Sequence, residues 1–355
     1  MRQLNVVIIG QGRSGRDIHG LHLKKDTERF KVVGVVEKMD VRRRRAEAEY
    51  GCETFSDYTE LFGRNDIDLV VNATPSHFHY AITKDLLSHG FNVLCEKPCV
   101  PTVKEFDDLC DTAKNNGRGL LVFQQSRFAH YFEKVKEIIA SGDLGRIVQI
   151  NIQFNGFARR WDWQCCREFN GGNLANTGPH PLDQALNLMD MYDGMPEVFC
   201  RMDRCNTFGD AEDYCKLILT APGKPLVDLE ISSADSYPLF TYKLHGTRGG
   251  LKGTMAHIDW KYFREDEAPD QQLIKEPLTM GGDEKLPAYC SEKLTWHEMS
   301  WDGDASAPFI AAVQTYYDQI YALFTEGRPH DIRLEQVRQQ LAVIEEAHRQ
   351  NPHIG

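Results

Sequence analysis

A glycine-rich turn placed directly after an apolar run is the feature that most constrains this fold. The segment Gly10-Gln11-Gly12-Arg13-Ser14-Gly15 follows the β-branched run Asn5–Ile9 and precedes a helical stretch that we expect to reach Leu23. The first glycine permits a tight turn, the second lets the backbone approach a pyrophosphate, and the third allows close packing of helix on strand. The helix N-terminus also attracts negative phosphates. Because strand and helix flank it, the motif predicts a dinucleotide-binding turn, and a glycine turn without a ligand is the less favoured alternative.

The first 125 residues alternate apolar runs with helical stretches. We expect strands at Asn5–Ile9, Lys31–Val36, Leu69–Ala73, Asn92–Cys95 and Leu120–Phe123, and helices at Val41–Tyr50, Tyr80–His89 and Thr102–Asn116. Such alternation is typical of a parallel sheet covered by helices on both faces. Residues 1–125 are therefore expected to form an α/β, Rossmann-type domain.

The pattern changes near residue 125, where we place a domain boundary. After a helix at Phe132–Ser141, longer strands are expected at Ile147–Phe154, Val198–Asp203, Tyr214–Thr220, Leu226–Ser232 and Tyr242–His245. Turn clusters separate several of them, which indicates a mostly antiparallel sheet. Residues 265–305 are polar and expected to be loop-dominated. Residues 126–355 are thus predicted to form an α+β domain with a large open sheet, and the closing helices, Pro308–Glu326 and Leu334–Arg349, are candidates for packing back on the first domain.

The composition limits the kinds of partner that the protein is expected to bind. The 355 residues hold 41 basic and 52 acidic side chains, giving a formal charge of −11, whereas nucleic-acid binding needs a basic footprint. The dense basic tract Arg42–Arg45 is short enough to be a solvated helix face. No apolar stretch approaches the ~20 residues of a membrane span, and the N-terminal run leads straight into the glycine turn, so a signal peptide is not expected. We therefore expect a cytoplasmic protein whose ten cysteines, without a C-x-x-C pair, stay reduced.

The residues after the second expected strand bear on the type of dinucleotide. Glu37 lies 22 positions beyond Gly15, where a carboxylate can accept hydrogen bonds from both ribose hydroxyls and repel a 2′-phosphate. Lys38 and Arg42 argue mildly the other way, because a cation could hold that phosphate. The balance favours NAD over NADP.

The next strand ends in Thr74-Pro75-Ser76-His77, and ligands bind at the carboxyl ends of parallel strands. This turn is therefore predicted to lie along the cofactor, with an ordinary β–α turn as the alternative. The expected cofactor contacts are Gly10, Gly12, Arg13, Ser14, Gly15, Glu37, Lys38, Arg42, Thr74, Pro75, His77, His79, Glu96 and Lys97.

Two segments carry candidate catalytic groups. Lys97 follows another strand end, where a lysine can hold a substrate hydroxyl and stabilise developing alkoxide charge. In the glycine-rich segment Gly171–Asp183, the side chains of Asn176, His180 and Asp183 recur at helical spacing and would share one face. A histidine is the natural base for a hydroxyl proton. A structural Lys-Pro turn, a capping or packing histidine, and a metal site are the alternatives; metal is the least favoured, since there is no His-x₃-His and no dense carboxylate set.

An aromatic and charged segment, residues 157–163, suits a sugar, because indole faces stack on C–H faces and charged groups bond hydroxyls. An aromatic edge that packs on a neighbouring subunit explains it equally well. The expected substrate contacts are Gln125, Arg127, Arg160, Trp161, Trp163, Asn173, Asn176 and His180.

Taken together, these motifs resemble the glucose–fructose oxidoreductase / inositol dehydrogenase (Gfo/Idh/MocA) family over nearly the whole chain. The resemblance is carried by the glycine turn and by Asn72–His79, Cys95–Pro98, Gln125–Phe128 and Gly171–Asp183. It implies a Rossmann domain followed by a large open sheet that commonly forms the face of a dimer or tetramer. It also implies that Lys97 and His180 are catalytic.

One position departs from that family pattern, which usually has aspartate four residues before the histidine. Here the position holds Asn176, which can hydrogen-bond a hydroxyl but cannot stabilise an imidazolium by charge. We expect Asn176 to bind substrate while Asp183 or Lys97 supports proton transfer.

The resulting hypothesis is an NAD-dependent dehydrogenase, acting as a homo-oligomer, that oxidises a ring hydroxyl of a sugar, glycoside or cyclic polyol, with C3 of a glucoside as one candidate. Two alternatives stay open. One is an NAD-dependent glycosidase or lyase that recycles its cofactor internally. The other is a non-catalytic regulatory protein that binds the cofactor.

Overall fold

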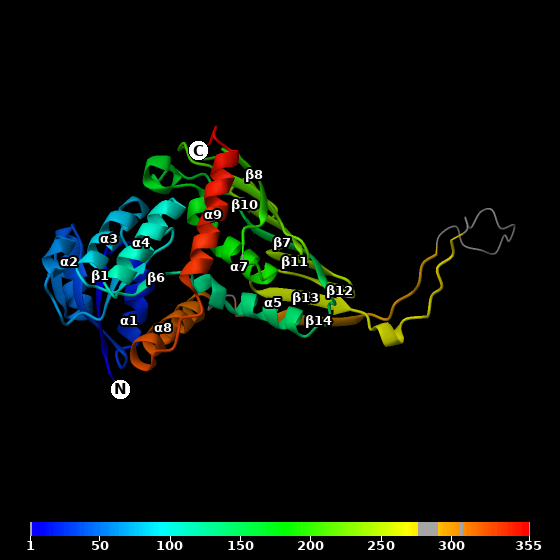
Figure 1. Cartoon of the computed structure of the whole chain (residues 1–355), viewed down its shortest axis with the longest axis horizontal. Helices are drawn as coiled ribbons and strands as arrows, with labels where there is room; N and C mark the ends of the chain where they lie inside the picture. The colour runs from blue at the N-terminus through cyan, green and yellow to red at the C-terminus, as the bar shows by residue number, and fades with distance from the viewer. Residues whose placement is uncertain (1, 193, 276–289, 305–307, 355) are drawn as a thin grey trace.

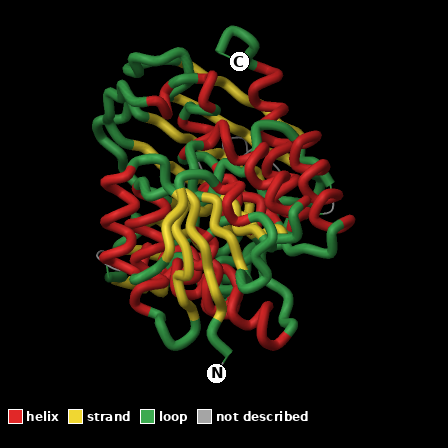
Figure 2. The backbone as a smooth tube through the Cα atoms, turned by 90° about the vertical axis from the view of Figure 1, so that its left-hand side faces the viewer, coloured by secondary structure: helices red, strands yellow, loops and turns green. Residues whose placement is uncertain are grey.

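The N-terminal part of the chain folds around a six-stranded sheet in which every pair of neighbours is parallel. The computed structural model describes residues 2–192, 194–275, 290–304 and 308–354. The strand order is β3-β2-β1-β4-β5-β6, with parallel pairing throughout. The strands are β1 Leu4–Ile9, β2 Phe30–Val36, β3 Glu53–Phe55, β4 Leu69–Asn72, β5 Val93–Cys95 and β6 Leu120–Val122. The central strands are apolar and buried on both faces, as a sheet between two helix layers requires, and Figure 2 shows helices on both sides of it.

The helices of this part are α1 Leu21–Lys25, α2 Asp40–Tyr50, α3 His79–Ser88 and α4 Val103–Asn115. The helix expected after Gly15 begins earlier and differs in type, because Arg13–Gly20 forms a π-helical segment that continues into α1. Bulges of this wide type often occur at functional sites.

The second sheet has eight strands in the order β14-β13-β12-β11-β7-β10-β9-β8. They are β7 Ile147–Asn155, β8 Glu197–Asp203, β9 Tyr214–Thr220, β10 Leu226–Ser232, β11 Tyr242–Gly246, β12 Gly249–Gly253, β13 His257–Tyr262 and β14 His297–Asp302. Only β7 and β10 pair in parallel, and the other neighbours are antiparallel. The predicted fold class, a Rossmann sheet followed by a mostly antiparallel sheet, is confirmed.

Residues 265–305 are not wholly loop, so that expectation needs correction. β14 lies inside the segment and pairs along its length with β13, and residues 276–289 and 305 lie outside the described residues. β12 and β13 were also not expected, because their glycines and charged residues hide the strand pattern. Beyond β13, residues 263–275 run away from the body of the molecule (Figure 1).

One face of the second sheet is covered by α5 His130–Ala140 and α7 Pro179–Met189, with the short α6 Asn173–Asn176 leading into α7. The side chains of the strands alternate accordingly between two faces. In β8, Cys200 and Met202 are buried, whereas Phe199, which lies on the opposite face with the strand's charged residues, is 61% exposed. The opposite face is thus open in the single chain, and assembly through it stays a prediction.

The two closing helices, α8 Pro308–Glu326 and α9 Leu334–Gln350, return to the first sheet (Figure 1). On α8, the hydroxyl of Tyr316 donates to the carbonyl of Val122 in β6 at 2.7 Å. On α9, Gln340 accepts a hydrogen bond from Gln124 at 2.5 Å. No helix in the described part of the chain is long and apolar enough to cross a membrane.

Candidate active site

A cleft of about 1020 Å³ opens at the carboxyl ends of β1, β2, β4 and β5 and extends toward α6 and α7. This is the edge of a doubly wound sheet at which ligands bind. Most of the predicted site residues line it: Gly10, Gly12, Arg13, Ser14, Glu37, Lys38, Arg42, Thr74, Pro75, His79, Glu96, Lys97, Gln125, Arg160, Trp163, Asn176 and His180.

The three glycines of the turn lack side chains for different reasons. Gly10 has φ +94°, and a Cβ on it would lie 2.5 Å from the carbonyl oxygen of Ala73. Gly15 does not line the cleft; a Cβ there would lie 1.9 Å from the carbonyl oxygen of Gly10, so it serves the close packing of helix on strand. At Gly12 a Cβ would meet nothing within 4 Å, which leaves its backbone open to the cleft.

Glu37 closes the far end of this turn. Its carboxylate is 8% exposed and accepts the backbone N–H groups of Gln11 at 2.9 Å and of Met39 at 3.0 Å. Arg42 lies 3.5 Å from the same carboxylate. A carboxylate has about four acceptor sites, and these three donors leave about one of them for a further hydrogen bond.

The basic tract of α2 is more than a solvated face, which the sequence did not indicate. Arg43 donates to the carbonyls of Glu37 and Lys38 at 2.7 and 2.8 Å, and Arg45 donates to the carbonyl of Gln11 at 3.1 Å. These arginines hold the backbone of the two turns that would surround an adenosine.

His79 joins two turns that border the cleft. Its ring nitrogens lie 2.7 Å from the carbonyl of Pro98 and 2.8 Å from that of Thr74. Both nitrogens must carry a proton to donate to both carbonyls. Burial alone would lower the pKa of His79, but the adjacent Cys95 and the two carbonyl bonds raise it to about 9. His79 therefore acts as a buried imidazolium that fixes the Thr74 and Pro98 turns relative to each other.

Lys97 reaches across the cleft from the end of β5 to α6. Its Nζ donates to the backbone carbonyl of Asn176 at 2.8 Å and lies 3.4 Å from the side-chain Oδ1 of the same residue. Burial lowers the pKa of Lys97, and the cations Arg13 and Arg160 lower it further, against the opposing charge of Glu96. A lysine with a depressed pKa releases its proton more readily, which suits it to acid–base work.

His180, near the start of α7, lies at the same end of the cleft. Its Nδ1 is 3.1 Å from the hydroxyl of Ser126, a residue that the sequence gave no reason to select. Burial lowers the pKa of His180 to about 3, and the charge of Lys97 contributes. The ring is therefore neutral near pH 7 and can accept a hydrogen bond from a hydroxyl, but it is a weaker base than a free imidazole.

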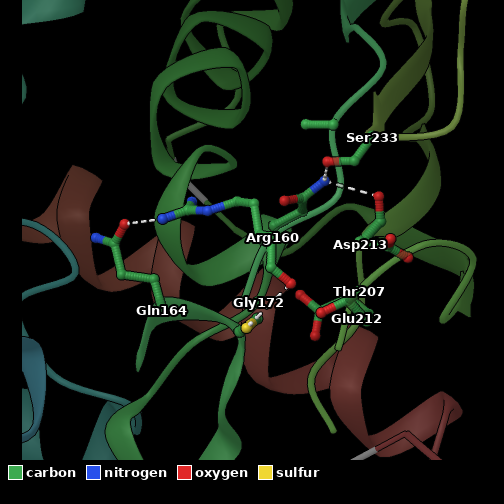
Figure 3. A pocket seen from close by; sticks show the side chains of 10 residues that line it. Arg160, Gln164, Gly172, Thr207, Glu212, Asp213 and Ser233 are labelled. Atoms are coloured by element: carbon green, nitrogen blue, oxygen red, sulfur yellow. Dashed lines mark hydrogen bonds between the residues drawn. The ribbon is translucent and has the colours of Figure 1, made fainter. Parts of the chain in front are cut away.

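A polar chain extends from Asn176 toward solvent. Gln164 donates to Oδ1 of Asn176 at 3.3 Å, and Arg160 donates to Gln164 and pairs with Asp162 at 2.8 Å. Figure 3 shows the guanidinium of Arg160 and the amide of Gln164 facing each other. Gln164 is a cleft residue that sequence reasoning missed; two positions before it, Asp162 caps a short turn and sets its place.

Behind this chain, a small cavity of about 10 Å³ holds no more than one water molecule. Asn173 lines it and donates to the carbonyl of Asp213 at 2.7 Å and to the hydroxyl of Ser233 at 2.9 Å. Glu212 accepts the backbone N–H of Leu174 at 2.8 Å, and burial raises the pKa of its carboxyl to about 7. The structure thus places Asn173 in the support of the glycine-rich segment and away from the cleft.

Asp183 and Arg127 are likewise not brought to the cleft. They are 2% and 4% exposed and form a bidentate ion pair, with Nε of Arg127 2.9 Å from the carboxylate of Asp183. Gln336 of α9 accepts a further hydrogen bond from Arg127. Asp183 and His180 do lie on the same helix, α7, but the side chain of Asp183, one turn further on, is buried in the core. Its position therefore favours a structural role.

Two aromatic candidates also lie outside the cleft. Trp161 is 79% exposed and contacts the ring of Phe208, whereas Trp163, two residues on, lines the cleft. His77 packs its ring against Phe169 and Phe78. Within the described residues, no group of three or more His, Cys, Asp or Glu side chains is arranged to hold a metal ion.

Comparisons with known proteins agree with this geometry. A family model described as "Oxidoreductase family, NAD-binding Rossmann fold" matches residues 4–124, and the GFO/IDH/MocA C-terminal domain matches residues 132–252. A 2,7-anhydro-N-acetylneuraminate hydratase of Mediterraneibacter gnavus is 26% identical over 71% of this chain and 67% of its own length. The NADP-dependent scyllo-inositol 2-dehydrogenase IolW of Bacillus subtilis is 30% identical over 55% of this chain and 53% of its own.

The fold is also shared with a solved structure, the putative oxidoreductase YvaA of Bacillus subtilis. It superposes with a TM-score of 0.79 at 21% identity, over 99% of this chain and 96% of that one. Because family models match both parts of the chain and together span most of it, the protein belongs to the GFO/IDH/MocA family of NAD-binding Rossmann-fold oxidoreductases.

Proposed function

We propose that this oxidoreductase is an NAD-dependent dehydrogenase that oxidises a ring hydroxyl of a sugar, glycoside or cyclic polyol. The observation that carries the proposal is the meeting of Lys97 and His180 at one end of a cleft whose other end is the glycine turn. Dehydrogenation of an alcohol needs a group that takes the hydroxyl proton and a place for the hydride. The scyllo-inositol dehydrogenase among the relatives acts on a compound of this class.

The cleft fits a dinucleotide. The backbone of Gly12 and the start of the π-helical segment would hold the pyrophosphate, and Glu37 would hold the adenosine ribose. The turn at Thr74 and Pro75 would lie along the nicotinamide half. When bound, NAD supplies the acceptor for the hydride.

The chain's own residues would then handle the proton. His180, neutral near pH 7, accepts the proton of the substrate hydroxyl, since its Nδ1 is held by Ser126 and its Nε2 is left for substrate. Lys97 donates a hydrogen bond to the same oxygen and stabilises the negative charge that develops on it. Asn176 and Gln164 provide amide groups for neighbouring hydroxyls, and Trp163 an apolar face.

We infer a preference for NAD over NADP. Glu37 is buried and fixed by two backbone N–H groups, so a 2′-phosphate would meet a carboxylate that cannot move away. Lys38 and Arg42 also line the cleft, but Arg42 lies against Glu37 and is partly neutralised by it. The NADP-dependent relative shows that a similar protein can use NADP, so the preference must be measured.

A second candidate is a hydratase, lyase or glycosidase that oxidises and later re-reduces its substrate. One relative is named as a hydratase of an anhydro sugar acid. The same lysine, histidine and cofactor cleft would serve, but no reduced cofactor would accumulate.

The deciding experiment mixes purified protein with NAD and a panel of inositols, free sugars and glycosides, and follows both the absorbance of reduced nicotinamide and substrate consumption by NMR. The dehydrogenase predicts absorbance that rises with substrate loss and disappears in Lys97→Met. Consumption with a flat trace would favour internal recycling. Neither signal, with cofactor binding retained, would favour a regulatory protein that only binds the cofactor.

We also propose that the chain divides near residue 125 and assembles as a homo-oligomer through the open face of the second sheet. The exposed side chains of Phe199 on β8 and Leu226 on β10, which lie on that face, support this. Light scattering measures the molar mass of the unaltered protein and of Phe199→Asp. Assembly predicts a multiple of the mass of one chain in the unaltered protein and a lower mass in the variant. A mass equal to that of one chain in the unaltered protein would contradict assembly.

A further inference from the structure

Three buried titratable side chains form a chain directly beneath the Lys97 turn, and the proposed chemistry does not use them. Oε1 of Glu96 lies 3.1 Å from Nε2 of His19, and Nδ1 of His19 lies 2.8 Å from the hydroxyl of Tyr317. Glu96 is 4% exposed, and His19 and Tyr317 are 0% exposed. The three come from the end of β5, from the π-helical segment and from α8, so the chain links three separate parts of the sequence.

The protons of this network can be placed from its donors and acceptors. The other carboxylate oxygen of Glu96, Oε2, accepts the backbone N–H of Lys97 at 3.0 Å. Burial alone would raise the pKa of Glu96, but the hydrogen bond from His19 and the charges of His19, Lys97 and His79 lower it to about 2. Burial raises the pKa of Tyr317 well above its usual value. Glu96 is therefore a carboxylate that accepts from Nε2 of His19, and Nδ1 of His19 shares a hydrogen bond with the Tyr317 hydroxyl.

This arrangement decides what the adjacent ammonium can do. Glu96 and Lys97 are neighbours in sequence and opposite in charge, yet the described ion pairs include none between them, and the carboxylate pairs with His19 instead. Nζ of Lys97 extends the other way, to the carbonyl of Asn176. We infer that His19 and Tyr317 are positioning residues for the oxidation: by holding the Glu96 carboxylate, they keep the Lys97 ammonium at the substrate end of the cleft.

The inference rests on the proposed function for its catalytic meaning but not for its geometry. Besides Glu96, the charged groups facing Lys97 are Arg13 and Arg160, and His180 lies nearby. If His19 no longer donates, the buried carboxylate loses its side-chain partner, and Lys97 is then the cation whose charge acts on it most strongly. We expect the two to pair, which draws Nζ away from Asn176 and raises the pKa of Lys97.

The test compares four variants in the full-length protein. His19→Leu removes the donor, and His19→Gln keeps an N–H that can reach Glu96. Tyr317→Phe removes only the hydroxyl. Tyr316→Phe is the matched control. Tyr316 is the neighbouring buried tyrosine of α8, but its hydroxyl donates to the carbonyl of Val122 and takes no part in the network.

The first readout needs no substrate: NMR titration of ¹³C-methylated lysines, with Lys97→Arg assigning the signal, measures the pKa of Lys97 directly. The second is the split between kcat and KM and the pH profile of oxidation. We expect the Lys97 pKa to rise and kcat to fall about tenfold in His19→Leu, with a smaller change in Tyr317→Phe, recovery in His19→Gln and no change in Tyr316→Phe.

An unchanged or lowered Lys97 pKa in His19→Leu would overturn the inference, as would an equal effect of Tyr316→Phe. NADH binding, measured by fluorescence, separates folded variants from damaged ones; if His19→Leu fails to bind, Tyr317→Phe decides. If the unaltered enzyme oxidises nothing in the panel, the proposed function fails, while the lysine titration still decides whether His19 positions Lys97.

Discussion

The Nζ of Lys97 donates to the backbone carbonyl of Asn176 at 2.8 Å, although the two residues lie 79 positions apart. The bond joins the carboxyl end of β5 to α6, so it connects the cofactor cleft of the first sheet with the segment that presents His180. A backbone carbonyl holds an ammonium without neutralising it, which leaves the charge of Lys97 available to an oxygen of the substrate.

Replacing Lys97 by Met should abolish oxidation while preserving cofactor binding. The Met side chain fills similar space but provides neither charge nor proton, and the loss of such a group costs about 10²- to 10⁴-fold in rate. Steady-state rates with a substrate from the panel, set beside NADH binding by fluorescence, measure the two effects separately. A variant that oxidises at more than a tenth of the normal rate would contradict a catalytic role.

Asn176→Asp should move the pH profile of oxidation to higher pH. The new carboxylate would lie 3.4 Å from Nζ of Lys97, where an opposite charge favours the ammonium form. The limb that reports Lys97 should shift by about one pH unit or more. Asn170→Asp, the same change of charge one residue before the glycine-rich segment, should leave the profile where it is.

Glu37→Ser should shift the cofactor preference toward NADP. It removes the carboxylate that repels a 2′-phosphate and leaves Lys38 and Arg42 lining that end of the cleft. The ratio of kcat/KM for NADP to that for NAD should rise by about tenfold or more, since a like charge near the phosphate costs at least about 1.4 kcal/mol. The control, Asp40→Asn, removes an acid that is next to α2's arginines but does not line the cleft; a ratio that rises equally there would point to net charge as the cause.

Asp183→Asn should destabilise the protein rather than disable the site. Removing one partner of a buried ion pair leaves the guanidinium of Arg127 uncompensated, which costs about 3–5 kcal/mol. Urea unfolding measures the loss. At a temperature where the variant is folded, kcat should stay within about threefold of normal; a selective loss of kcat without a loss of stability would return Asp183 to the catalytic set.

His330 should make the protein sensitive to mild acid. Burial, aided by the charge of Arg127, lowers its folded pKa to about 4, whereas in the unfolded chain a histidine takes up a proton below about 6.5. Stability is therefore full above pH 6.5 and is lost as the pH falls toward 4, because only the unfolded state binds the proton. Between pH 7 and pH 5 the unfolding free energy should drop by about 2 kcal/mol more in the unaltered protein than in His330→Gln.

The elements that the sequence predicts best are the strands that are buried on both faces. β1, β4 and β5 are buried on both faces and consist of apolar runs, so their positions follow from composition alone. β12 contains three glycines and β14 is charged and exposed, and only pairing with neighbouring strands makes them regular. In the site, the glycine turn and Lys97 can be recognised from the local sequence around them.

Other site residues depend on long-range contacts that no local pattern carries. Ser126 becomes relevant only because α7 places His180 beside it. Arg127 and Asp183 look like binding residues in the sequence, and their mutual pairing is visible only when segments 56 positions apart are brought together. Nothing in the local sequence marks Gln164 or Tyr317 as site residues. Only tertiary contacts bring Gln164 to Asn176 and Tyr317 to His19.

The return of α8 to the first sheet has a consequence for synthesis. His19, Val122 and the glycine turn leave the ribosome long before Tyr316 and Tyr317 do, so the buried partners that complete the cofactor-binding half are made last. A ribosome-bound chain that lacks α8 would expose Phe30 of β2, on which Tyr317 and Tyr321 pack, and would leave Glu96 and His19 without Tyr317. The first sheet and its turns should therefore acquire their full affinity for a dinucleotide only after α8 has left the ribosome.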